Sequence, residues 1–276
     1  LHDADRSLAD IYAGNPTATV RGRKIPRTWQ ALAGLALGEG KEIGEASVVE
    51  LDLLRRIRAF THVNDRPRIA AYRRILAALA LAETPAEAEE VLAGLGEKAA
   101  YAPMLYFSLW PTGDPGEMAV KLWEAVRSGV FRAELEQVLE VREDALRTVA
   151  RPLPGRLAGV PVLSHGRYTR EELLAGFGVG TQDEEKPGNV REGVKYVRHL
   201  GVDILLVTLR KSEADYSPTT LYRDYALTPN LFHWESQSTT GENSPTGQRY
   251  ITHESRGTDV VLFVRETKVG LSLIHI

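Results

Sequence analysis

The sequence contains no cysteine among its 276 residues. Disulfide bonds, thiolate zinc sites and cysteine nucleophiles are therefore excluded from this chain. It also has no apolar run that approaches the roughly 20 residues needed to cross a membrane, and its first residues lack the layout of a signal peptide. We therefore expect a cytoplasmic protein that does not engage a membrane.

A strong excess of one charge is also missing, because 34 lysines and arginines stand against 37 aspartates and glutamates. Residues 1–150 carry 19 basic and 22 acidic side chains, and residues 151–276 carry 15 of each. Neither half is the strongly basic domain that is typical of many nucleic-acid-binding proteins. A local basic stripe is compatible with this balance, because a groove needs only a few arginines or lysines to contact phosphates.

The first half of the chain has the pattern of a helical domain. Hydrophobic residues make up 43% of the sequence, which is enough for a sizeable core. Thr84-Pro85-Ala86-Glu87 is a complete helix-start signal, with a hydroxyl N-cap, a proline at the first helical position and a glutamate that closes a capping box. From apolar periodicity and such signals, helices are expected over residues 48–60, 68–82, 84–94, 99–109, 116–128 and 130–150.

The composition changes at Arg151-Pro152-Leu153-Pro154-Gly155, and short apolar segments separated by glycine, proline and serine follow. A second capping box, Thr169-Arg170-Glu171-Glu172, predicts a short helix that ends at Gly178. Strands are expected at 194–197, 202–209 and 259–264. The predicted fold class is α+β: an all-helical linker or accessory domain over 1–150, then a mixed, mainly β domain over 151–270, barrel-like or sandwich-like.

Side chains suited to recognition are densest over residues 217–264, above all over 231–240. There, aromatic, amide, hydroxyl and ionisable residues alternate without a helical period. Such a mixture is expected where a sheet presents side chains to a ligand. A loop over 241–247 is followed by Arg249-Tyr250-Ile251, which we expect to resume an extended segment.

Four motifs in this part of the chain resemble the uncharacterised bacterial family known as domain of unknown function 3427. They are SPTTLYRDY at 217–225, LFHWESQS at 231–238, SPTGQRY at 244–250 and LFVRE at 262–266. The resemblance covers residues 160–266. In that family the domain follows the motor core of large DEAD/DEAH-type, superfamily 2 helicases, often with a phospholipase-D-type nuclease domain ahead of the core.

The resemblance implies a parent protein that is an ATP-dependent helicase using ATP and Mg. This chain has no nucleotide-binding P-loop, so we expect it to bind neither cofactor. The helicase motor core in the same full-length chain is an expected partner. The first residue is leucine rather than methionine, which indicates an excerpt from a longer protein. The family pattern continues beyond the strand at 259–264, whereas residues 271–276 fit no part of it, so we expect a non-native tail and a domain that is incomplete at its end.

Nucleic-acid binding, with DNA as the expected partner, is the function that these residues favour. Trp234, Tyr222 or Tyr250 can stack on unpaired bases, while Arg223 or Arg249 can hold phosphates. Gln237 can form hydrogen bonds to a base edge. The complete set of predicted binding residues is Thr219, Thr220, Tyr222, Arg223, His233, Trp234, Gln237, Ser238, Arg249 and Tyr250.

Three alternatives remain open. Glu266-Thr267-Lys268 after an apolar strand has the Glu-x-Lys arrangement of restriction-type, metal-dependent DNA nucleases, which also need a second carboxylate from Asp203 or Asp224. The second alternative is a metal site made by His165, His199, His233 and His253, although their spacing matches no metal-ligand signature. The third is a purely architectural domain that docks on the helicase motor, since aromatic and arginine residues serve protein interfaces equally well.

Overall fold

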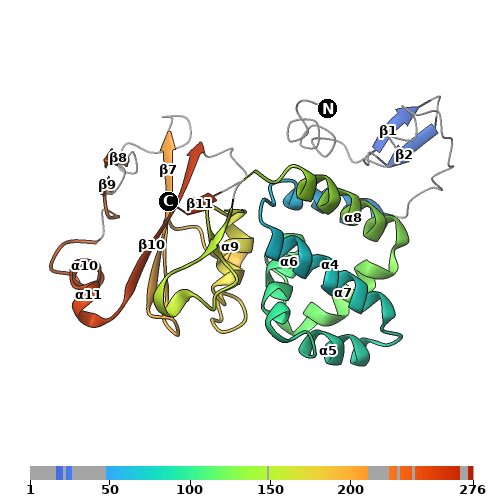
Figure 1. Cartoon of the computed structure of the whole chain (residues 1–276), viewed down its shortest axis with the longest axis horizontal. Coiled ribbons are helices and arrows are strands. Elements are labelled where there is room, and N and C mark those ends of the chain that lie inside the picture. Colours follow the sequence, from blue (N-terminus) through green and yellow to red (C-terminus); the bar gives the residue numbers. More distant parts are fainter. Residues whose placement is uncertain are drawn as a thin grey trace.

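The computed structural model of the protein describes residues 17–20, 23–26, 48–147, 149–210, 224–228, 231–237, 240–267 and 273–275. A helical half and a sheet-containing half lie side by side (Figure 1). The α+β fold class predicted from the sequence is confirmed. In the described part of the chain, no helix is both long and apolar enough to cross a bilayer.

The helical half consists of short helices that begin where the sequence provides caps. Its helices are α3 (Val48–Arg56), η1 (Ile57–Phe60), α4 (Arg66–Leu81), α5 (Pro85–Ala93), η2 (Gly96–Tyr101), α6 (Ala102–Leu109), η3 (Pro115–Glu117), α7 (Met118–Arg127) and α8 (Gly129–Asp144). The Thr84 hydroxyl accepts from the Glu87 backbone N–H at 3.2 Å, which confirms the helix start predicted there. The strands β1 (Thr17–Val20) and β2 (Arg23–Pro26) form an antiparallel hairpin, an element that the helical interpretation of residues 1–150 did not include.

The second half is built around one open sheet. Its elements are β3 (Arg151–Pro152), η4 (Gly155–Leu157), β4 (Leu163–Ser164), β5 (Arg167–Tyr168), α9 (Arg170–Gly176), η5 (Pro187–Asn189), β6 (Val194–Val197), β7 (Val202–Arg210), β8 (Tyr225–Thr228), β9 (Leu231–His233), α10 (Pro245–Ile251), α11 (His253–Arg256), β10 (Asp259–Thr267) and β11 (Leu273–His275). Five of the strands form a sheet in the order β5-β11-β10-β7-β6, and the described strands do not close into a barrel.

The parallel pair β7 and β10 determines where the recognition stretch lies. Residue by residue, β10 runs beside β7 from Asp259 opposite Val202 to Thr267 opposite Arg210. Parallel neighbours need a crossover connection, and here it contains β8, β9, α10 and α11. In Figure 1 these elements lie on the side of the sheet away from the helical half.

Helices cover the sheet on opposite faces. Phe177, at the end of α9, packs edge-to-face on Phe263 of β10, with ring centroids 6.0 Å apart. Phe263 lies opposite Leu206 of β7, so the side chains of these two residues point to the same face of the sheet. Asp203 is three residues from Leu206 on β7 and therefore points to the opposite face, where it contacts Arg249 of α10. The sheet is thus placed between α9, which faces the helical half, and α10.

The prediction of an extended segment at 249–251 was wrong, because those residues end α10. The Ser244 hydroxyl accepts from the Gly247 N–H at 3.0 Å, and Pro245 occupies the first turn. This is the same hydroxyl-and-proline start that predicts α5 correctly. Likewise, β9 ends at His233, so the strand-like alternation over 231–240 continues beyond the strand itself.

One hydrophobic core runs through both halves. It includes Ile75, Leu105 and Leu139 from the helical half together with Leu174 and Phe263 from the second half, each at most 1% exposed. α9 reaches α6 closely because Gly176 has no side chain. A Cβ added there would lie 2.6 Å from Cγ2 of Val162 and 3.3 Å from Sδ of Met104.

The compositional change at residues 151–155 is therefore a border between two kinds of secondary structure within a shared core. Of the expected tail, residues 273–275 form β11, which pairs with β10 and β5. The non-native origin of residues 271–276 stays a prediction.

Candidate functional site

Five aromatic side chains gather around the crossover connection, and we call them the aromatic cluster: Tyr196, Tyr225, His233, Trp234 and Tyr250. The rings of Tyr225 and His233, a cross-strand pair of β8 and β9, are stacked with centroids 4.9 Å apart and planes 18° apart. Trp234 follows directly and meets Tyr250 of α10 edge-to-face, with centroids 5.4 Å apart. The two aromatic pairs are therefore linked through consecutive residues of the chain.

An ion pair between Arg249 and Asp203 lies beside two rings of the cluster. Arg249 donates from Nε and Nη2 to the two carboxylate oxygens of Asp203, at 2.7 and 2.8 Å. Its guanidinium carbon lies 4.0 Å from the centroid of the Tyr196 ring and 5.6 Å from that of Tyr250. Asp203 is completely buried. The guanidinium is thus held between a buried carboxylate and two rings.

The electrostatics of this ion pair explain two pKa shifts. The hydrogen bonds to Asp203 raise the pKa of Arg249 above its ordinary value. Burial, reinforced by the negative charge of Asp203, raises the pKa of the Tyr250 hydroxyl. Both groups therefore keep their protons at neutral pH, and the positive charge of Arg249 is compensated inside the protein.

The hairpin β8–β9 carries the most accessible part of the cluster. Tyr225 is 46% exposed, and the neighbouring Leu227 and Leu231 are 52% and 56% exposed. Aromatic rings with accessible faces can stack on the rings of a ligand. The hairpin therefore presents an exposed apolar and aromatic surface beside Trp234.

Polar side chains hold the chain that follows the hairpin. The Asp224 carboxylate accepts from the Glu235 backbone N–H at 3.1 Å. Further along, the Ser236 hydroxyl donates to the Thr240 carbonyl oxygen at 3.0 Å. Both contacts hold the chain directly after Trp234.

The structure brings three of the predicted binding residues together: Trp234, Arg249 and Tyr250. His233 precedes Trp234 in the chain and stacks on Tyr225. Gln237 lies in the loop after β9 and is partly buried. The remaining predicted binding residues, Thr219, Thr220, Tyr222, Arg223 and Ser238, lie outside the described residues.

Three members of the site were missed as binding residues at the sequence level: Tyr225, Tyr196 and Asp203. Asp203 was considered only as a nuclease ligand. Its place in an almost entirely apolar strand was a usable signal, because a buried carboxylate needs a partner. Tyr225 was detectable as an aromatic residue at the start of one hairpin strand, opposite His233 in the next.

Two of the carboxylates proposed for a nuclease site, Asp203 and Glu266, do not come together. Val260 lies opposite Asp203, and Glu266 comes six residues later on β10. That offset is about 20 Å along the strand. Glu266 instead pairs with Arg210 at 3.0 Å, with both side chains exposed. Lys268 lies outside the described residues, and no group of three potential metal ligands occurs within the described residues, the four histidines included.

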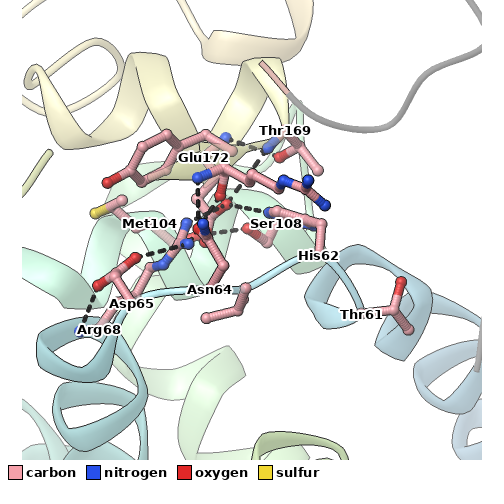
Figure 2. Close-up of polar contacts among 12 residues, drawn as sticks. Thr61, His62, Asn64, Asp65, Arg68, Met104, Ser108, Thr169 and Glu172 are labelled. Carbon is pink, nitrogen blue, oxygen red and sulfur yellow. Dashed lines mark hydrogen bonds and ion pairs between the residues drawn. The ribbon is translucent and has the colours of Figure 1, made fainter. Parts of the chain in front are cut away.

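A second polar cluster lies at the junction of the two halves, and we call it the buried ion network: His62, Asp65, Arg68, Tyr72 and Glu172. Figure 2 shows His62, Asp65, Arg68 and Glu172 of this network. A guanidinium nitrogen of Arg68 lies 2.9 Å from a carboxylate oxygen of Glu172 on α9, which forms an ion pair. The Glu172 carboxylate is also hydrogen-bonded to His62 at 2.8 Å and accepts from the Tyr72 hydroxyl at 2.6 Å. Arg68 also pairs with Asp65 at 2.8 Å. Opposite charges of α4 and α9 therefore pair across the junction.

Solvent has almost no access to this network. Arg68 and Glu172 are completely buried, and His62 is 8% exposed. Burial alone would raise the pKa of Glu172, but Arg68 and His62 outweigh it and hold the pKa below its ordinary value. Burial also raises the pKa of Tyr72, with a further contribution from the negative charge of Glu172. A buried ion cluster of this kind has a structural role.

A shallow groove of about 610 Å³ lies between η4 and the turn from α11 to β10. Its cation, Arg156, donates to the Asp259 carboxylate at 2.7 Å and to the Gly201 carbonyl oxygen at 3.2 Å. The groove is thus lined by a guanidinium that ties three segments of the chain together.

Residues 162–272 match the model of a family described as Domain of unknown function (DUF3427). The match contains α9, the strands from β5 to β10 and the whole aromatic cluster. No curated protein and no solved structure matches the chain.

Proposed function

We propose that the aromatic cluster binds nucleic acid, with DNA as the partner. The observation that carries this proposal is the exposed stack of Tyr225 on His233, adjoined by the pair of Trp234 and Tyr250. Successive aromatic rings of this kind are a recurrent means of holding bases, and each stacked base contributes about 1–3 kcal/mol.

Each residue of the site has a role in this proposal. Tyr225 and Trp234 supply ring faces to bases. Gln237, in the loop after β9, supplies an amide for a base edge. Arg249, whose charge is compensated by Asp203, positions the rings of Tyr196 and Tyr250 rather than holding a phosphate.

The wider setting that we propose is a bacterial ATP-dependent DEAD/DEAH-type helicase, in which this region steers the motor to its substrate. The resemblance of the motifs over 217–266 supports this association. ATP and Mg belong to the motor core in this proposal, and the described region performs no catalysis of its own. Sequencing of the complete reading frame tests the proposed association with a helicase. We expect it to encode a motor core in the same chain.

Binding is tested by fluorescence anisotropy of labelled single- and double-stranded DNA titrated with the complete chain at several salt concentrations. Trp234→Ala should weaken binding about tenfold, the loss expected for one stacked base. The control is Leu81→Ala, because Leu81 is 83% exposed at the end of α4. Circular dichroism verifies that each variant is folded.

Failure of the folded chain to bind any of these oligonucleotides would refute the proposal. The architectural alternative, docking on the helicase motor, would then be favoured by the exposed Leu227 and Leu231 of the hairpin. A Trp234→Ala variant that binds as tightly as the parent would instead remove the aromatic cluster from the interface.

A further inference from the structure

Among the described residues, three cations on β6, on α10 and at the end of β7 are paired with carboxylates. Arg249 of α10 is paired with Asp203. On β6, Lys195 lies 2.8 Å from a carboxylate oxygen of Asp183 and 2.7 Å from one of Glu185. At the end of β7, Arg210 pairs with Glu266 at 3.0 Å. These side chains have little net charge to offer to phosphates, which are the main source of affinity for duplex DNA.

Ring faces are what the cluster offers. The planes of Tyr225 and His233 are 18° apart, and Tyr225 is 46% exposed, so its ring is accessible to a further aromatic group. In a duplex both faces of each base are already stacked on neighbours. Only unpaired nucleotides present free faces to protein side chains.

The helices of the crossover are also short. α10 has seven residues and α11 has four, so neither is a long helix of the kind that lies along a major groove. The surface beside them is a protruding two-stranded hairpin with exposed aromatic and leucine side chains. This shape suits a flexible strand whose bases are turned outward.

We infer that the ligand of the aromatic cluster is an unpaired stretch of nucleic acid, held by base stacking on Tyr225 and Trp234 rather than by its phosphates. This inference rests on the proposed function and specifies its substrate class. It also fixes the salt dependence. Few phosphate contacts should give a plot of log affinity against log salt with a slope shallower than about −2.

The experiment uses the complete chain and three labelled probes of equal length: an oligothymidine single strand, a mixed-sequence duplex and a single strand whose sites are abasic. The abasic strand keeps the phosphates and lacks the bases. We expect the oligothymidine to bind at least tenfold more tightly than the other two. Tyr225→Ala should weaken its binding about fivefold to a hundredfold, while Tyr225→Phe, which keeps the ring, should retain it.

Leu81→Ala is the control, because it removes an exposed apolar side chain from the end of α4, away from the hairpin. Abasic and duplex probes that bind as tightly as the oligothymidine would overturn the inference and leave nucleic-acid binding in place. An equal loss in Tyr225→Phe and Tyr225→Ala would also overturn stacking as the mode of contact. Absence of binding to all three probes would refute the proposed function itself.

Discussion

Arg68 of α4 and Glu172 of α9 meet across the junction of the two halves, with 2.9 Å between guanidinium nitrogen and carboxylate oxygen and no exposed surface on either side chain. The pair is supported by His62, Asp65 and Tyr72. Breaking one side of such a pair leaves an unbalanced buried charge, which is far more costly than the loss of a surface ion pair. The stability of the chain should therefore depend strongly on it.

Arg68→Met should lower the free energy of unfolding by about 3–5 kcal/mol, because Glu172 would lose its main counter-charge in the interior. Urea denaturation followed by circular dichroism measures the change. Lys121→Gln serves as the control, since the pair of Lys121 with Glu117 is at the surface and should contribute at most about 0.5 kcal/mol. Equal effects of the two substitutions would contradict the assignment of Arg68 to a buried network.

The pH dependence of stability should report on Glu172. Its pKa in the folded protein is below the ordinary 4.5, so its charged form stabilises the fold above that pH. The contribution is lost as the pH falls from about 4.5 through the lowered pKa. In urea titrations from neutral pH to about pH 3, the gap in stability between parent and Glu172→Gln should narrow with acidity. A gap that stays constant would show that Glu172 is not charged in the folded state.

Removal of Arg249 should destabilise the second half by leaving the buried Asp203 carboxylate without its cation. We expect Arg249→Met to cost about 3 kcal/mol and the double variant with Asp203→Asn to recover part of that loss. Thermal unfolding and the near-ultraviolet signal of Trp234 and Tyr250 follow the effect. If Arg249→Met weakened nucleic-acid binding without changing stability or the aromatic signal, a direct phosphate contact would be the better explanation.

Gly176→Ala should disrupt the contact of α9 with its neighbours. The added Cβ would lie 2.6 Å from Val162, which requires a shift in packed side chains at a cost of about 1–3 kcal/mol. Gly129→Ala is the control, because no heavy atom lies within 4 Å of a Cβ built there. That substitution at the start of α8 should be neutral or stabilising by up to about 1 kcal/mol. Calorimetry should therefore show a lower melting temperature for Gly176→Ala. The melting temperature of Gly129→Ala should be unchanged or higher.

Local signals predicted local structure well. The caps at Thr84 and Thr169 correctly placed α5 and α9, and the apolar run after Val202 correctly placed a buried strand. The start of α10 at Ser244-Pro245 carries the same kind of signal, but the alternating side chains before it suggested an extended chain. At α10 the helix-capping signal and the strand-like alternation of side chains predict different structures. The hydrogen bond of the Ser244 cap is formed, and the segment is helical.

The pairings that create the site were beyond sequence analysis for a physical reason. Asp203 meets Arg249 only because the crossover returns α10 to one face of β7, and no local period encodes that return. Arg68 and Glu172 likewise come from different halves of the chain. The aromatic stretch itself was recognisable from composition, and Trp234 and Tyr250 do lie together.

The family match covers residues 162–272, which marks where the sequence resembles the family. The hydrophobic core, however, continues across residue 162 without interruption. Truncation of the chain at residue 162 would remove α6 from its contact with α9 and leave the carboxylate of Glu172 without Arg68. The smallest unit worth transplanting or crystallising therefore begins near α3, and the helices before the family boundary are as much a part of the domain as its sheet.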